Sequence, residues 1–354
     1  MEWNETDYLN TSEGEHHELI PAEWIGLPLL AFATCGVVSN VAVASTIVFG
    51  GLLKKSQVYK PMLSLLISDT LNLLLSRCRL SLSIVLQRRI LPCPWHRLVD
   101  DLALWPWQQS CLCLSLLAVH RYYGVCRPNC QPRLFTPSGM TILCLGLWPL
   151  SLITTVVSQY VLPCCRHAVT FEFYSAGFER DQNWSWNPVD LFIDLPYNLC
   201  STIVFAFCYG AIFLNMRRTN KALSHFALRE SVAYTTRCVG VQQDNASVAN
   251  GSSADTSTNS SCSVQPPSAT ARQTSHRQRQ ERRFALQFLF ISCVYVVSWM
   301  GFRLVPLAVG DSHHLRKLYA VIPLVAIVHL SNNAVVYLIG NAELRSRVFF
   351  WKRW

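Results

Sequence analysis

Long runs of apolar residues alternate with shorter polar, basic or proline-containing stretches along the 354-residue chain. Seven of these runs are long enough to cross a bilayer as a helix, which takes roughly 20 residues. Backbone groups in lipid must pair within their own segment, and barrel strands would be shorter and would alternate in polarity, so each run is predicted to be a helix. The pattern therefore predicts an all-α membrane protein, a seven-transmembrane helix bundle, with spans at 25–50, 61–86, 98–122, 138–161, 188–214, 284–309 and 318–340.

Composition agrees with a membrane protein, because 51% of the residues are hydrophobic and only 14% are charged, against about 25% in a typical soluble domain. The segment 1–24 contains acidic side chains but no lysine or arginine, whereas Lys54, Lys55 and Lys60 follow the first span. Basic residues beside a span favour the cytoplasm, so the N-terminus is predicted outside the cell and the C-terminus inside. The net charge of +9 then reflects membrane topology rather than nucleic-acid binding.

The polar segments divide the chain into predicted regions. The loop between the fifth and sixth spans is rich in Ser, Thr, Asn and Gln at its middle, a composition typical of disorder. The divisions are an extracellular, glycosylated N-terminus at 1–24, spans one to five at 25–214, a long and partly disordered third cytoplasmic loop at 215–283, spans six and seven at 284–340, and a short amphipathic eighth helix with a tail at 341–354. Asn4, Asn10 and Asn183 begin glycosylation sequons on the predicted outer side.

Ionisable residues lie inside the second span. A carboxylate in a membrane is expensive, so Asp69 is a functional candidate by default. Arg77 and Arg79 lie further along the same span, near its predicted outer end. Two interpretations stay open for these arginines. Their long side chains extend to the membrane surface, or they point into an interior cavity and contact an anion.

Three spans contain short motifs. The third span ends in His120-Arg121-Tyr122, with Pro128 seven residues after the arginine. The sixth span contains Trp299, and the seventh ends in the stretch from Asn333 to Tyr337. These motifs resemble the Asp/Glu-Arg-Tyr and Asn-Pro-x-x-Tyr motifs of rhodopsin-like (class A) G-protein-coupled receptors. Four positions depart from the family pattern: His120, Val204, Gly301 and Ala334.

The resemblance implies a receptor that alternates between two helix arrangements. An extracellular ligand would favour the one in which the sixth helix swings outward and an intracellular heterotrimeric G protein binds. Glu281, which precedes Trp299 by about five helical turns, would be the main partner of Arg121 in the inactive state. The coupling and switch residues implied by the family are His120, Arg121, Tyr122, Glu281, Trp299, Asn333 and Tyr337.

The resemblance also implies a structural sodium ion, bound by Asp69, Ser110 and Asn333, since hard cations take oxygen ligands. Ser110 as a small packing residue is the alternative, and no other cofactor is expected. Cys93, Cys164 and Cys165 fall on the predicted outer side, where an oxidising compartment permits a disulfide. The pairing stays open, because His96 occupies the position of the family's cysteine at the outer end of the third helix.

The ligand is less defined by the sequence. Acidic residues on the outer side would attract a basic peptide, and the second and third spans resemble the galanin-receptor-like peptide branch, including its orphan members. A small anionic or lipid ligand is the alternative, because Arg77, Arg79 and Arg303 would suit a negative group. The candidate ligand-cavity residues are Arg77, Asp100, Asp101, Ala103 and Arg303.

The four departures leave a second function open, an atypical receptor with weak or no G-protein coupling that acts as a decoy, a constitutive receptor or a scaffold. An enzyme is not expected, because the chain has no Gly-rich phosphate loop or HExxH motif. A transporter would show inverted repeats. Expected partners besides the ligand and the G protein are arrestin, receptor kinases and membrane lipid, with no nucleic acid. The expected location is the plasma membrane.

Overall fold

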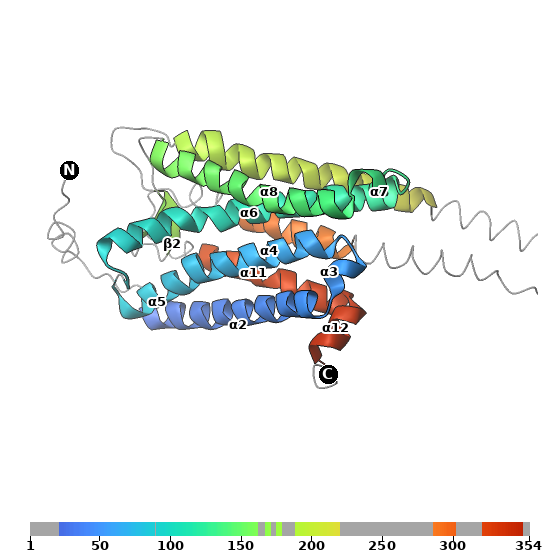
Figure 1. Ribbon diagram of the computed structural model, residues 1–354. Coiled ribbons are helices and arrows are strands. Elements are labelled where there is room, and N and C mark those ends of the chain that lie inside the picture. The colour runs from blue at the N-terminus through green and yellow to red at the C-terminus, as the bar shows by residue number, and fades with distance from the viewer. Residues whose placement is uncertain are drawn as a thin grey trace, which may run out of the picture.

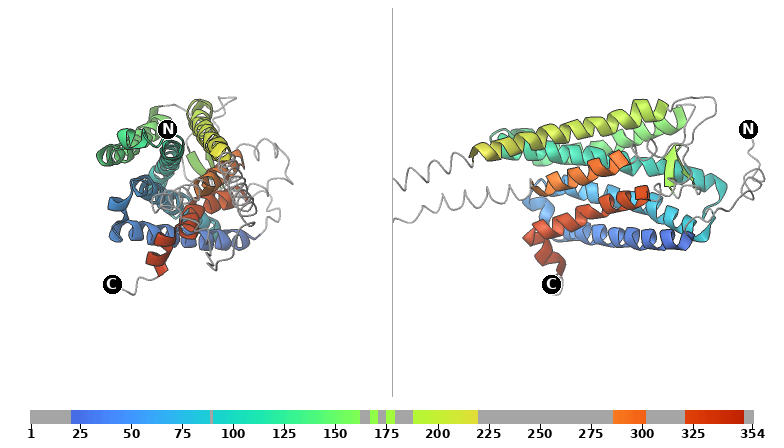
Figure 2. Two further views of the ribbon diagram at one scale, coloured as in Figure 1. Left: turned by 90° about the vertical axis from the view of Figure 1, so that its right-hand side faces the viewer. Right: turned by 180° about the vertical axis from the view of Figure 1, so that it is seen from behind.

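The computed structural model describes residues 21–88, 90–161, 167–170, 175–178, 188–219, 286–301 and 321–349. The helices of these residues run side by side along one bundle (Figure 1). The helices α8 and Leu191–Thr219 lie on one side of it, and α2 lies on the other with α11 (Figure 2).

The helices begin and end close to the predicted spans. The first span is α2 (Ala22–Phe49), and the second consists of α4 (Tyr59–Asn72), η1 (Leu73–Cys78) and α5 (Arg79–Leu86) in continuous succession. The third is α6 (Cys93–Cys126), and the fourth is α8 (Pro137–Val156) followed by η2 (Val157–Val161). The fifth is the helix Leu191–Thr219, which overlaps η3 (Asp190–Asp194), the sixth is the helix Leu286–Gly301, and the seventh is α11 (Val321–Gly340). Short helices α3 (Leu52–Lys55) and α7 (Gln131–Leu134) lie between the long ones, and α12 (Ala342–Phe349) follows α11.

Five helices in the described part of the chain are long and apolar enough to cross a membrane: Ala22–Phe49, Trp95–Cys126, Pro137–Val161, Leu191–Thr219 and Val321–Gly340. The second helix carries Asp69, Arg77 and Arg79 and is less apolar. The sixth is described only over Leu286–Gly301. Apolar side chains cover the outside of the bundle, as lipid contact requires; Ile142 is 69% exposed and Phe207 is 66% exposed.

Small residues let the first and last long helices approach each other. Gly36 of α2 is buried, and a Cβ built there would overlap the Ser331 hydroxyl of α11 and touch Leu73 at 3.0 Å. Close approach at glycine is a common way to pack helices in lipid. Asn40, one turn further along α2, donates to the Leu330 carbonyl at 3.1 Å and fixes the same pair of helices.

Gly36→Leu should therefore destabilise the bundle. Overpacking a filled interface costs about 1–3 kcal/mol, occasionally more, and we expect a clear fall in the melting temperature of the purified protein. Gly146→Leu in α8 is the matched control, because Gly146 is exposed and a Cβ added there would meet nothing within 4 Å. Equal melting temperatures for the two variants would contradict this packing.

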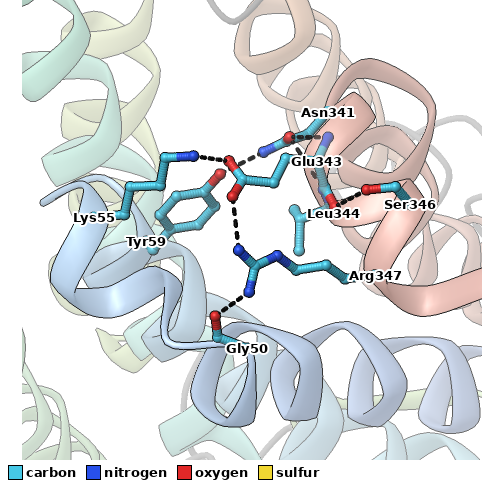
Figure 3. A network of polar contacts seen from close by, with 8 residues as sticks. All are labelled: Gly50, Lys55, Tyr59, Asn341, Glu343, Leu344, Ser346 and Arg347. Carbon is cyan, nitrogen blue, oxygen red and sulfur yellow. Dashed lines mark hydrogen bonds and ion pairs between the residues drawn. The ribbon is translucent and has the colours of Figure 1, made fainter. Parts of the chain in front are cut away.

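A short helix is tied to one end of the bundle (Figure 3). Asn341 caps the N-terminus of α12, because its Oδ1 accepts hydrogen bonds from the backbone N–H groups of Glu343 and Leu344. Glu343 pairs with Lys55 at 2.8 Å and with Arg347 at 3.0 Å, and Arg347 donates to the carbonyl of Gly50. We call this end of the bundle the α12 end.

Two strands lie at the opposite end, which we call the hairpin end. β1 (His167–Thr170) and β2 (Ser175–Phe178) pair antiparallel, with His167 opposite Phe178. β1 lies against α6, and β2 lies near α11. The hairpin was not predicted, because hydropathy identifies membrane spans and gives no signal for a short strand in a loop.

Candidate functional site

A buried carboxylate joins three helices at the middle of the bundle. Asp69 of α4 is fully buried, and its Oδ1 accepts a hydrogen bond of 2.7 Å from the Ser110 hydroxyl of α6. Its Oδ2 accepts from the amide Nδ2 of Asn333 in α11. The Ser68 and Ser110 hydroxyls are 2.9 Å apart and extend the cluster. The three predicted sodium-site residues are therefore in direct contact.

This cluster has oxygen atoms that suit a hard cation. Asp69 supplies a carboxylate and Ser110 a hydroxyl. The Oδ1 atom of Asn333 is buried and accepts no hydrogen bond from the described residues, although buried polar atoms usually have a partner. Carboxylate, hydroxyl and amide oxygens are the groups that hard cations prefer. The residues present fit a sodium ion.

Arg121 lies buried at the α12 end of α6. Its side chain is beside the sixth helix, where the guanidinium Cζ is 5.1 Å from the ring centroid of Phe288. The Phe288 ring is in turn 5.7 Å from the ring of Tyr337 in α11. Two predicted switch residues, Arg121 and Tyr337, thus contact the same aromatic ring. Glu281, the partner predicted for Arg121, lies outside the described residues.

His120 makes its contacts away from the sixth helix. Its Nε2 lies 3.3 Å from the amide nitrogen of Gln131 in α7, and its ring meets Phe135 edge-on at 5.1 Å. The histidine therefore connects α6 to the short helix α7. The ring of Tyr122 is half-buried and lies 5.8 Å from that of Phe207 in the helix Leu191–Thr219.

An aromatic cluster lies between the third, fifth, sixth and seventh helices. Tyr295 contacts the rings of Trp107 at 5.9 Å and His329 at 5.5 Å, and its hydroxyl donates to the Oδ1 of Asn198. The predicted switch residue Trp299 is buried one helical turn after Tyr295. The prediction included Trp299 and missed Tyr295, although the spacing of one turn from Trp299 was a visible signal.

Charged side chains form a second buried group near the hairpin end. Arg79 of α5 forms an ion pair with Asp100 of α6, and His96 Nδ1 lies 2.9 Å from the other oxygen of Asp100. All three of these side chains are buried. Of the two interpretations given for Arg77 and Arg79, extension to the membrane surface is wrong, because both side chains are buried and Arg79 turns inward to the carboxylate of Asp100.

The other predicted cavity residues on α6, Asp101 and Ala103, are buried as well. Arg77 and Arg79 also affect the hairpin. Burial, together with the charge of these two arginines, lowers the pKa of His167 in β1 to about 3. His167 is therefore neutral at physiological pH, and the positive charge here comes from the arginines.

The comparisons with known proteins agree with this arrangement. Residues 39–337 match the model of the 7 transmembrane receptor family of the rhodopsin type. The chain belongs to the rhodopsin family of seven-transmembrane receptors. It is therefore a G-protein-coupled receptor of class A, a multi-pass membrane protein in a family of signalling receptors rather than enzymes, and the seven-helix fold predicted from the sequence is confirmed.

The receptor also resembles a solved structure, the crystal structure of squid rhodopsin. The likeness has a TM-score of 0.67 at 15% sequence identity and covers 94% of this chain and 86% of the squid chain. At this identity the likeness concerns the fold alone. A search of curated proteins found no match.

Several predicted site residues of the receptor lie outside the described residues: Glu281, Arg303, Cys164, Cys165, Asn4, Asn10 and Asn183. Cys93 is the first residue of α6. The disulfide, the glycosylation sites and the contribution of Arg303 stay predictions. The structure thus brings together Asp69, Ser110 and Asn333 at the centre, and Arg121 and Tyr337 around Phe288 at the α12 end.

Proposed function

We propose that the receptor binds an extracellular peptide at its hairpin end and activates a heterotrimeric G protein at its α12 end. The observation that carries the proposal is the position of Arg121, buried against Phe288 of the helix Leu286–Gly301. The arginine becomes accessible at the α12 end only if that helix moves. A ligand that binds one arrangement of the helices more tightly than the other shifts the population toward it.

This function requires the hairpin end to face outside and the α12 end to face the cytoplasm of a cell at its plasma membrane. The N-terminal segment 1–24 contains no lysine or arginine. Lys54 and Lys55 belong to α3 at the α12 end, and Lys55 pairs with Glu343 there. Cationic residues favour the cytoplasmic side, which supports this orientation and the domain order with an external N-terminus and an internal third loop.

The hairpin supports a peptide ligand. β1 and β2 pair only with each other among the described strands. The outer edge of β1 is engaged at His167, whose backbone N–H donates to Gln159 Oε1 at 3.0 Å, so the edge of β2 is the one that an extended peptide would join as a further strand. Asp100 is already paired with Arg79 and His96, so a basic peptide would be attracted by other acids, such as those of the N-terminus. A ligand of this kind agrees with the resemblance to the galanin-receptor-like branch.

A ligand screen on cells that express the receptor tests this function. G-protein activation is measured with a panel of Gα subunits while basic peptides and acidic lipids are added separately. We expect a basic peptide to activate a Gα subunit in these cells and not in untransfected cells. Binding of the labelled peptide should be saturable, and an excess of the unlabelled peptide should displace it. Activation by acidic lipids alone would instead favour the anionic ligand, for which the buried Arg77 is the candidate contact.

A second candidate function is a receptor with weak or no G-protein coupling. The observation that favours it is His120, which replaces the family's acid beside Arg121 and contacts Gln131. In that case no Gα subunit would respond to a ligand whose binding is nevertheless saturable. Recruitment of arrestin, measured on the same cells, would show whether the receptor acts through another partner.

The Asp69 cluster is proposed to bind a structural sodium ion. The ion would supply a positive charge beside a buried carboxylate, while Ser110 and Asn333 orient the Asp69 oxygens. We expect the melting temperature of the purified receptor to be higher in sodium chloride than in choline chloride at equal ionic strength, because a ligand stabilises the state that binds it. Asp69→Asn should abolish the difference, and a sodium effect that survives in this variant would contradict the site.

A further inference from the structure

We propose that Phe288 is a positioning residue that holds Arg121 through a cation–π contact between the guanidinium and the face of the Phe288 ring. The contact belongs to the arrangement in which the sixth helix lies beside Arg121, which we call the closed arrangement. The inference deepens the proposed function and rests on it, because it names the group that restrains the arginine before a G protein binds. It adds an aromatic ring on the sixth helix to the restraint that the sequence assigned to Glu281.

The geometry favours this contact. Arg121 Cζ lies 5.1 Å from the Phe288 centroid, within the roughly 6 Å over which a cation is attracted to an aromatic face. Arg121 is 3% exposed and Phe288 is 1% exposed. Water therefore screens the attraction little, and such contacts are stronger when they are desolvated.

The neighbouring residue cannot supply the same restraint. An acid beside the arginine would attract it, whereas His120 carries no negative charge in any protonation state. Its ring is also engaged with Gln131 and Phe135 on the other side of α6. Position 120 therefore provides no acid beside the arginine, and the ring of Phe288 lies next to the guanidinium.

Phe288 also joins the third helix to the seventh. Its ring lies 5.7 Å from the ring of Tyr337, and Tyr337 is 1% exposed. The sixth helix therefore contacts a switch residue of α6 and one of α11 through one side chain. Outward movement of the sixth helix would break the contacts of Phe288 with Arg121 and with Tyr337 at once. The stability of the closed arrangement should therefore depend on the charge distribution of the Phe288 ring.

The test changes the ring's electrostatics while keeping its shape. Phe288 is replaced by 3,4,5-trifluorophenylalanine, which occupies nearly the same volume but lacks the negative ring face, and separately by leucine. Deuterium uptake of the segment 286–301 is measured on the purified full-length receptor in lipid nanodiscs. We expect both replacements to raise uptake several-fold, because the closed arrangement loses its restraint. Phe290→Leu is the matched control, since Phe290 is 54% exposed on the same helix.

The Arg121→Ala background separates the contact from simple packing. If Phe288 acts through Arg121, the trifluoro replacement should have no further effect on uptake once the arginine is absent. Equal uptake for phenylalanine and trifluorophenylalanine with Arg121 present would overturn the proposal. So would a trifluoro effect of the same size in both backgrounds, because the ring would then act through something other than the guanidinium.

Deuterium uptake requires neither a ligand nor a G protein, so this test is independent of the proposed coupling. Suppose that the trifluoro replacement raises deuterium uptake only when Arg121 is present, while no Gα subunit responds in cells. The contact between Phe288 and Arg121 is then supported and G-protein coupling is not. If a Gα subunit responds while the trifluoro replacement leaves deuterium uptake unchanged, G-protein coupling is supported and Phe288 is not the residue that restrains Arg121.

Discussion

Asp100→Ala is expected to unfold much of the hairpin end and to remove most of the receptor from the cell surface. The substitution leaves Arg79 buried without the carboxylate that it pairs with, and it also removes the partner of His96. Removing one member of a buried ion pair costs about 3–5 kcal/mol, against a total stability of about 5–15 kcal/mol for a protein. Surface expression and the melting temperature of the purified receptor measure the effect.

A double variant distinguishes the loss of the pair from the loss of packing. Arg79→Leu combined with Asp100→Leu removes both charges and retains apolar volume, so it should be less damaging than Asp100→Ala alone. Arg97→Ala, at an exposed position on the same turn of α6, is the control for a general effect of charge removal. A melting temperature for Asp100→Ala equal to that of the wild type would show that the pair contributes little.

Arg121→Ala is expected to reduce basal and ligand-induced G-protein activation to the level of untransfected cells, while surface expression is retained. In the proposed function, the guanidinium lies beside Phe288 and becomes accessible at the α12 end when the sixth helix moves outward. Alanine leaves only a methyl group there, with no guanidinium for a partner to contact. Activation is measured with the Gα subunit that responds to the wild-type receptor, at matched surface expression.

Glu281→Ala completes this experiment, because the sequence predicts that Glu281 restrains Arg121. Basal activation should rise in that variant if the glutamate contributes to the closed arrangement. If Glu281→Ala behaves like the wild type while Arg121→Ala is silent, the glutamate is not the partner. Normal activation by Arg121→Ala would contradict coupling through this arginine, and Arg97→Ala provides the control for arginine removal at the opposite end of α6.

The sequence predicted the helices well because lipid imposes a simple requirement on length and polarity. The span predicted at 25–50 corresponds to Ala22–Phe49, and that at 138–161 to Pro137–Val161. The central cluster was also accessible, because Asp69 is an intramembrane carboxylate and the spacing of Ser110 from Arg121 matches the family. Asp69, Ser110 and Asn333 are in contact as that reasoning implied.

Contacts between side chains of different helices were less accessible to sequence reasoning. Hydropathy places Arg79 and Asp100 near one end of the bundle but does not determine which faces of α5 and α6 meet. The pairing of Arg121 with Phe288 depends on the rotation of the sixth helix about its axis in the same way. An aromatic residue in an apolar run gives no sign that a cation lies over its ring.

The π-helical segment η1 (Leu73–Cys78) lies between Asp69 and Arg79. Such a segment accommodates one residue more than a regular α-helix over the same rise, and one residue corresponds to about 100° of rotation. Consider a relative whose second helix is a regular α-helix. If such a relative is aligned to this helix without a gap, every residue beyond Cys78 is matched one position away from its structural equivalent. Comparisons of receptors at Arg79 need a single-residue gap inside Leu73–Cys78 to match residues that face the same neighbours.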